Sequence, residues 1–130
     1  MSTEFYRCPI CGNVIIKLVD SGVTPHCCGE EMELLDANTF DGAKEKHVPQ
    51  VVSEGNDAVK VMIGEVPHPM SDAHYIKVIY LEAKQQGHDT AMIAWLNPDD
   101  KAEHIFRVKP SEVKSVYEYC NLHGLWVKKQ

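Results

Sequence analysis

Four of the five cysteines lie close together near the start of this 130-residue chain, at Cys8, Cys11, Cys27 and Cys28. Because five is an odd number, internal disulfides cannot pair all of them. Residues 1–36 contain little else that could form a core, since their main apolar runs are short, at Val14–Leu18 and Met32–Leu35. Two short strands are not stable alone, and a segment this small usually needs a metal or a disulfide. The cysteines therefore predict a small module folded around a metal ion.

The spacing of the cysteines favours four thiolates on one ion. Two residues separate the cysteines of Cys8–Gly12, so both thiolates can face the same ion, and the final glycine allows a tight reversal of the chain. In Cys27–Gly29 the two cysteines are adjacent. Neighbouring strand residues point to opposite faces, so this pair can share an ion only if the backbone kinks near Gly29. Zinc and iron both suit an all-sulfur tetrahedron, and the residues leave both open.

Composition excludes several classes of function. The net charge of −6 argues against a nucleic-acid partner or an anionic membrane surface, because both need an excess of Lys and Arg. Apolar runs such as Met92–Leu96 are too short to span a bilayer. Met1–Arg7 lacks the apolar stretch of a secretory signal, so we expect a cytoplasmic protein with reduced thiols rather than a disulfide framework.

The rest of the chain has a mainly β pattern. Residues 37–46 are polar and without periodicity, which indicates a linker carrying Glu45 and Lys46 into a second domain at 47–130. Short β-like runs at residues 58–66, 75–81, 90–96 and 103–108, separated by Gly and Pro, suggest a β-sandwich or small barrel. Gln86–Asp89 is typical of a hairpin turn. Val113–Cys120 has helical spacing but strand-like residues, so helix and strand both stay open.

A second set of metal donors is dispersed through this domain. It comprises four histidines in distinctive contexts and the fifth cysteine: His47, His68, His74, His123 and Cys120. His88 and His104 lie in polar surroundings, and we expect them to be surface or satisfied core histidines rather than ligands. A catalytic thiol–imidazole pair of Cys120 and His123 would need an orienting group and an oxyanion hole, for which no motif is present.

Counting the donors of this set narrows the choice of metal. Structural zinc closes at four ligands and blue copper prefers two histidines with one cysteine, whereas five nitrogen and sulfur donors suit redox iron with one open position. Ferrous iron with one thiolate and four neutral imidazoles carries a charge of +1, so this site would attract an anion although the whole chain is acidic. Lys46 could guide the anion, and Glu45 could bind the open position after oxidation. In isolation, Lys44–Lys46 would be read as a solvated run.

Several segments of the chain resemble desulfoferrodoxin, the two-iron form of the superoxide reductase family. The cysteine pattern of residues 8–28 is similar to desulforedoxin, including its adjacent pair. The active-site segments of the family are matched in order by Glu45–Pro49, His68–Met70, His74–Ile76 and Cys120–Trp126. The resemblance covers nearly the whole chain.

The resemblance implies a desulforedoxin-like module, residues 1–36, with iron on Cys8, Cys11, Cys27 and Cys28. It implies an immunoglobulin-like β-sandwich with a second iron held by His47, His68, His74 and His123 in a plane and by Cys120 axially. The expected activity is one-electron reduction of superoxide to hydrogen peroxide, with Lys46 drawing in superoxide and Glu45 capping ferric iron. Rubredoxin or a similar small donor would restore Fe(II), and a cytoplasmic homodimer is expected. A non-catalytic two-iron electron carrier and a zinc-stabilised interaction module are the alternatives.

Overall fold

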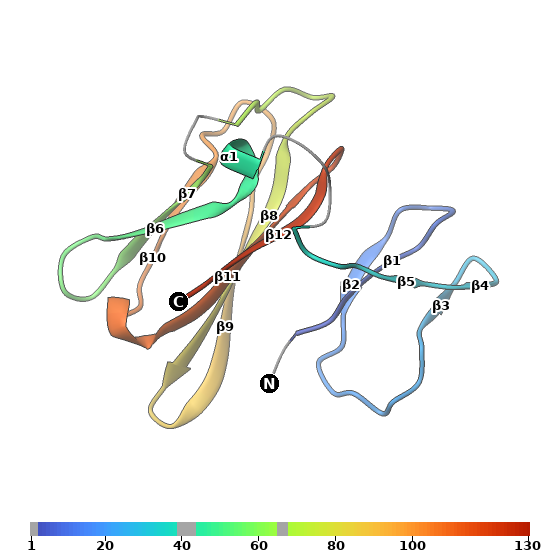
Figure 1. The fold of residues 1–130 in the computed structure, drawn as a ribbon, viewed down its shortest axis with the longest axis horizontal. Helices are drawn as coiled ribbons and strands as arrows, with labels where there is room; N and C mark the ends of the chain where they lie inside the picture. Colours follow the sequence, from blue (N-terminus) through green and yellow to red (C-terminus); the bar gives the residue numbers. More distant parts are fainter. Residues whose placement is uncertain (1–2, 39–43, 65–67) are drawn as a thin grey trace. The chain divides into compact units, whose positions relative to one another are not determined.

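A computed structural model describes residues 3–38, 44–64 and 68–130, except for the side chains of Lys44 and Glu45. The chain divides into two compact units, Met1–Asp36 and Ala37–Gln130. Strands dominate both units, so the predicted mainly β fold is confirmed (Figure 1). No helix among the described residues is long and apolar enough to cross a membrane.

The first unit is built from very short strands. They are β1 (Phe5–Arg7), β2 (Val14–Ile16), β3 (His26–Cys27), β4 (Glu30–Glu31) and β5 (Glu33–Leu34). Three of them form an antiparallel sheet in the order β2-β1-β5, and β3 pairs with β4. Its buried cluster consists only of Tyr6, Cys8 and Met32, with Cys27 packed against it. A core of this size gives little stability on its own, as the sequence indicated.

The second unit contains two antiparallel sheets. The first has the order β10-β7-β6 and consists of β6 (Pro49–Ser53), β7 (Val59–Ile63) and β10 (Glu103–Phe106). The second has the order β12-β11-β8-β9 and consists of β8 (Ile76–Gln85), β9 (His88–Trp95), β11 (Val113–Cys120) and β12 (Gly124–Lys129). A short helix, α1 (Lys44–His47), precedes the first sheet, and a 3-10 turn, η1 (Pro110–Glu112), precedes β11.

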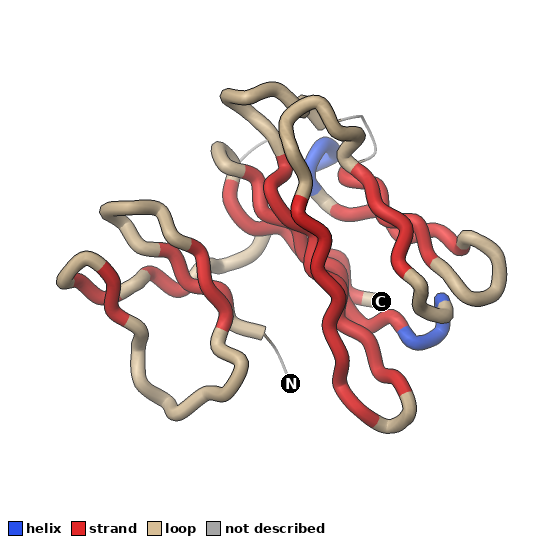
Figure 2. The backbone as a smooth tube through the Cα atoms, turned by 180° about the vertical axis from the view of Figure 1, so that it is seen from behind, coloured by secondary structure: helices blue, strands red, loops and turns tan. Residues whose placement is uncertain are grey.

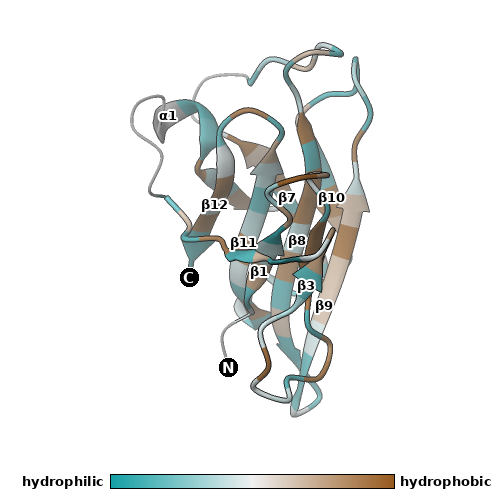
Figure 3. Ribbon diagram, turned by 90° about the vertical axis from the view of Figure 1, so that its right-hand side faces the viewer, coloured by the Kyte–Doolittle hydropathy of each residue, from teal (hydrophilic) through white to brown (hydrophobic). Residues whose placement is uncertain are grey.

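The two sheets enclose one hydrophobic core, which makes this unit a β-sandwich (Figure 2). Val59 and Val61 of β7 join Ile79 and Leu81 of β8 and Val116 of β11 in a single buried cluster. Their alternate spacing places one face of each strand inward. The same alternation is visible as successive hydrophobic and hydrophilic bands along the strands (Figure 3). The prediction of a β-sandwich that follows a small N-terminal module in the sequence is confirmed.

Three local predictions concern a strand, a hairpin turn and the linker of this unit. Val113–Cys120, left open between helix and strand, is strand β11 and lies between β8 and β12. The hairpin turn falls at Gln86–Gly87, where both residues have positive φ (51° and 80°) and Gln85 pairs with His88. Of the predicted linker, residues 39–43 lie outside the described residues. Asn38 at its start donates to and accepts from the backbone of Val127, which ties it to β12.

Candidate metal centres

The four N-terminal cysteines converge on one point of the first unit. Their Sγ atoms all lie within 4.8 Å of one another. The Sγ of Cys27 is 3.6 Å from that of Cys11 and 3.9 Å from that of Cys28. Four sulfurs placed about 2.3 Å from a central ion at the corners of a tetrahedron would be about 3.8 Å apart. The observed spacing therefore fits a single tetrahedral metal ion.

Backbone conformation explains how adjacent cysteines reach the same ion. Cys28 has a φ of +54° and Gly29 a φ of +77°, so the chain passes through two left-handed residues directly after Cys27. This is the kink expected from Gly29, and it turns both thiols toward the other pair. At the first pair, Gly12 has a φ of +82° and its N–H donates to the carbonyl of Cys8 at 3.0 Å, which closes the predicted tight turn.

The four clustered thiols can all lose their protons only if a cation is bound among them. The backbone N–H groups of Cys11 and Ile10, each 3.4 Å from the Cys8 Sγ, lower the pKa of that thiol to about 6. The pKa of Cys28 is raised to about 12, chiefly by its interactions with Cys11 and Cys8. Four thiolates cannot occupy so small a volume without a positive charge among them. A bound metal ion supplies that charge, and both zinc and iron suit this donor set.

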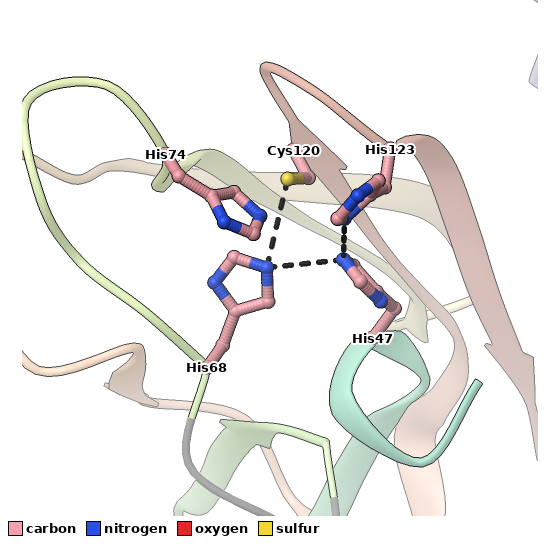
Figure 4. Close-up of side chains that lie close together, drawn as sticks. All are labelled: His47, His68, His74, Cys120 and His123. Atoms are coloured by element: carbon pink, nitrogen blue, oxygen red, sulfur yellow. Dashed lines mark hydrogen bonds between the residues drawn. The ribbon is translucent and has the colours of Figure 1, made fainter. Parts of the chain in front are cut away.

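The second cluster lies at one end of the β-sandwich and brings together all five donors that the sequence singled out (Figure 4). Neighbouring imidazole rings have centroids 4.6–4.7 Å apart and are nearly perpendicular, in the cyclic order His47, His68, His74, His123. The rings of His47 and His74, at opposite corners, are 6.5 Å apart. This ratio of diagonal to side is that of a square.

Contacts between the ring nitrogens fit a common ion. The His47 Nε2 lies 3.0 Å from the Nε2 of His68 and 2.9 Å from the Nδ1 of His123. Imidazole nitrogens bind zinc at about 2.0–2.1 Å, and two such nitrogens at right angles about one ion would be about 3.0 Å apart. The buried Nε2 of His74 has no hydrogen-bond partner within the described part of the chain. Cys120 adds a fully buried Sγ 3.5 Å from the His68 Nε2.

Three separate chain segments deliver these side chains. His47 ends α1, His68 and His74 lie on the loop before β8, Cys120 ends β11, and His123 follows in the turn to β12. The His68 Nδ1 is 2.6 Å from the Pro69 carbonyl oxygen, so this nitrogen donates and Nε2 is free to bind a metal. Such a partner fixes both the tautomer and the ring orientation.

The pKa values of two imidazoles in this cluster favour the neutral form that binds a cation. Burial lowers the pKa of His68 to about 4, and burial, then His123 and Lys46, lower the pKa of His74. Both imidazoles are therefore neutral near pH 7, as metal ligands must be. Burial raises the pKa of the Cys120 thiol, although the backbone N–H groups of Leu122 and His123 act in the opposite direction. A metal would displace the thiol proton.

Two charged residues and two further histidines were also considered in the sequence. Lys46 lies on α1 directly before His47, and its side chain is exposed. Glu45 belongs to the same helix, but its side chain lies outside the described residues. His88 and His104 are exposed and belong to neither cluster, as expected.

Two supporting residues were missed in the sequence. Gly64 has a φ of +80°, and a Cβ there would lie 2.5 Å from the backbone carbonyl group of Lys46, so a glycine lets α1 pack closely against the end of β7. Trp126 is buried, stacks on His47 and donates from Nε1 to the His123 carbonyl. The position of Trp126, three residues after the candidate ligand His123, could have indicated a supporting role. The sequence around Gly64 gave no such indication, because its contact with Lys46 is remote in sequence.

Comparisons with known proteins cover both units. The family model described as "Desulfoferrodoxin" matches residues 39–129, and "Desulfoferrodoxin, N-terminal domain" matches residues 2–35. A desulfoferrodoxin from Syntrophotalea carbinolica is 45% identical over 123 residues, covering 95% of this chain and 93% of that protein. The crystal structure of the superoxide reductase from Treponema pallidum matches with a TM-score of 0.78 and 31% identity over 99% of this chain and 100% of that one. A one-iron superoxide reductase from Giardia intestinalis matches with a TM-score of 0.55 and 32% identity, covering 67% and 98% respectively.

Proposed function

The chain belongs to the desulfoferrodoxin family, and from this premise we propose that it is a superoxide reductase. The reaction adds one electron and two protons to superoxide and yields one hydrogen peroxide. The single observation that carries the proposal is the cluster of four imidazoles and one thiol, whose ligand atoms all lie within 4.8 Å of one another. Ferrous iron, when bound, supplies the electron.

We assign His47, His68, His74, His123 and Cys120 as the residues that hold this iron. Iron held by these five donors would accept one more ligand to become six-coordinate, so a small anion could bind it. Four neutral imidazoles and one thiolate leave Fe(II) with a charge of +1, whereas four thiolates leave the other iron with −2. An anionic substrate is therefore attracted to the histidine centre and repelled from the cysteine centre.

Lys46 is proposed to draw superoxide to the histidine centre and to position a water molecule that donates protons. Its ammonium group is exposed, lies on the same short helix as His47, and is close enough to His74 to contribute to the lowering of that pKa. An exposed ammonium keeps three hydrogen-bond donors available. Glu45 is proposed to bind the open position once the iron is oxidised.

The four-cysteine centre is proposed to hold the second iron through Cys8, Cys11, Cys27 and Cys28. The buried cluster of the first unit is so small that metal binding would provide much of its folding energy. Rubredoxin or a similar small protein is the proposed electron donor, and the proposed form is a cytoplasmic homodimer, as in the family that the chain resembles. We propose that residues 1–36 form the four-cysteine module, that residues 37–46 form a linker carrying Glu45 and Lys46, and that residues 47–130 form the superoxide reductase domain.

Two measurements test this proposal. The product stoichiometry separates a reductase from dismutation, and the rate of superoxide consumption separates it from an electron carrier that does not react with superoxide. The reduced protein, loaded with iron, is mixed with superoxide without air, and hydrogen peroxide and oxygen are both measured. A reductase forms one peroxide for each superoxide consumed and no oxygen, whereas dismutation forms one oxygen for every two. Protein loaded with zinc is the matched control, because its ligands are intact but it has no electron to give. Consumption no faster than in that control would refute the proposal.

A further inference from the structure

The side chain of Asn121 joins two segments that carry different residues of the histidine centre. Asn121 lies between Cys120 and His123 in the turn that follows β11. Its Oδ1 accepts a hydrogen bond from the Tyr75 N–H at 3.0 Å, and its Nδ2 donates to the Ala73 carbonyl at 2.9 Å. Its own backbone N–H donates to the Tyr75 carbonyl at 3.3 Å. These three bonds contact the residues on both sides of His74.

The sheet alone does not hold His74 in this position. The ladder between β8 and β11 ends at the pair Ile76–Cys120, after a register shift between Tyr119 and Cys120. His74 lies beyond that last pair, on a loop whose local bridge joins only Ser71 to His74. Asn121 extends the contact between these two segments past the end of the ladder. Its side chain makes hydrogen bonds that a backbone group would make within the ladder.

The His74 ring itself receives little support. His68 is oriented by its bond to the Pro69 carbonyl, and His47 by the indole of Trp126. The buried Nε2 of the His74 ring has no hydrogen-bond partner within residues 3–38, 44–64 and 68–130. Its position therefore depends on the backbone of residues 73–75, which Asn121 holds against the turn carrying Cys120 and His123.

We infer that Asn121 is a positioning residue that sets His74 relative to Cys120 and His123 before metal binds. The inference rests on the proposed role of the histidine cluster as an iron site. Partners that orient metal ligands typically contribute about 10- to 100-fold to metal affinity. Loss of the Asn121 amide should therefore loosen the histidine centre selectively.

The chain offers a matched control in Asn38. Its side chain also makes two hydrogen bonds to backbone groups distant in sequence, accepting from the Val127 N–H at 2.8 Å and donating to the Val127 carbonyl at 3.1 Å. Asn38→Ala removes the same pair of side-chain bonds to backbone groups as Asn121→Ala, but at β12 rather than at a ligand segment. The Oδ1 of Asn121 additionally lies 4.0 Å from the Cys120 Sγ, a contact that Asn38 does not have. The four-cysteine centre is a second, internal control.

The experiment measures how fast a ferrous chelator removes iron from each centre of the full-length protein, and records the thiolate-to-iron charge-transfer band after oxidation. Asn121→Ala is expected to release the histidine-bound iron about 10- to 100-fold faster and to shift that band, with release from the cysteine centre unchanged. Asn121→Asp keeps the acceptor for Tyr75 but sets a carboxylate oxygen against the Ala73 carbonyl, so it should also accelerate release of this iron, and it decides the question if the alanine variant does not fold. Asn38→Ala should match the unmodified protein.

Two results would overturn the inference. One is a wild-type release rate in both Asn121 variants. The other is equal acceleration by Asn38→Ala, which would mean a general loss of stability. If the unmodified protein holds no iron in its histidine cluster, the proposed function fails together with this inference; if it does hold iron and Asn121→Ala behaves identically, only the inference fails.

Discussion

Trp126 stacks on His47, with ring centroids 5.0 Å apart and ring planes 19° from parallel. The same indole donates from Nε1 to the carbonyl oxygen of His123 at 3.1 Å. His47 ends α1 and His123 lies between the last two strands, so a single buried side chain fixes two donors that are remote in sequence. The histidine centre is thus supported by a buried side chain of β12.

Replacing this indole tests the support. Trp126→Phe keeps a ring under His47 but removes the bond to the His123 carbonyl, which should cost about 1 kcal/mol of unfolding free energy. We also expect iron to leave the histidine centre several-fold faster in a chelator assay. Trp95→Phe is the matched control, because Trp95 is 75% exposed and should change neither quantity. Equal effects of the two substitutions would contradict the assigned role.

Gly64 should tolerate no side chain. Gly64→Ala places a Cβ 2.5 Å from the Lys46 carbonyl group, so α1 must move and His47 with it. Gly55→Ala has a similar φ of +75° but meets nothing within 4 Å, so it should cost only about 1–2 kcal/mol of backbone strain. Urea unfolding should show a larger loss for Gly64→Ala, and metal analysis should show a reduced iron content at the histidine centre. A full iron complement in Gly64→Ala would refute the close-approach explanation.

Lys46 should act on the rate of encounter rather than on metal binding. Lys46→Ile is expected to slow the second-order reaction with superoxide by about tenfold and to flatten its dependence on ionic strength. Lys114→Ile makes the same change in net charge near the opposite end of β11, about 20 Å of strand from Cys120. Stopped-flow or radiolysis kinetics at several salt concentrations separate the two. If both variants respond alike, Lys46 has no local role.

Glu118 predicts an unusual pH dependence of stability. Its side chain is 1% exposed, both carboxyl oxygens lack a hydrogen-bond partner within the described residues, and burial raises its pKa well above 4.5. Below pH 4.5 the carboxyl is protonated in both states. As pH rises the unfolded chain ionises first, so stability falls until the pH passes the pKa of the folded state.

Glu118→Gln should remove this dependence. Relative to the original protein, the free energy of unfolding of the variant should rise by up to about 1.4 kcal/mol per pH unit above pH 4.5. Unfolding of the metal-free protein, followed by tryptophan fluorescence between pH 4 and 8, measures the difference. A difference that does not change with pH would show that Glu118 is not kept protonated by burial.

The donor residues and the fold class could be predicted because both follow from local patterns. Cysteine spacing identified the first cluster. The kink at Cys28 and Gly29 could be predicted because two adjacent cysteines cannot bind the same ion from a straight strand. Alternating apolar residues identified most strands of the sandwich. Short motifs around His68, His74 and Cys120 marked the second donor set, although nothing local shows that these residues meet.

Other features depend on contacts between distant segments. Val113–Cys120 could not be assigned from periodicity, since its last five residues are all buried and show no alternation between a buried and an exposed face. The roles of Gly64, Trp126 and Asn121 arise only when the turn after β11, α1 and the loop before β8 come together at one end of the sandwich. Four-residue α1 was hidden in a polar segment read as linker.

Pulse radiolysis of the fully reduced, iron-loaded protein tests superoxide reductase activity most directly. Superoxide generated in the pulse should oxidise the histidine-bound iron in a second-order reaction near the diffusion limit, about 10⁸–10⁹ M⁻¹ s⁻¹, with one hydrogen peroxide formed per superoxide and no oxygen. The iron of the four-cysteine centre should stay reduced in this first step. Oxidation of that centre first, or a histidine centre that does not respond to superoxide, would contradict the assignment and favour a simple electron carrier.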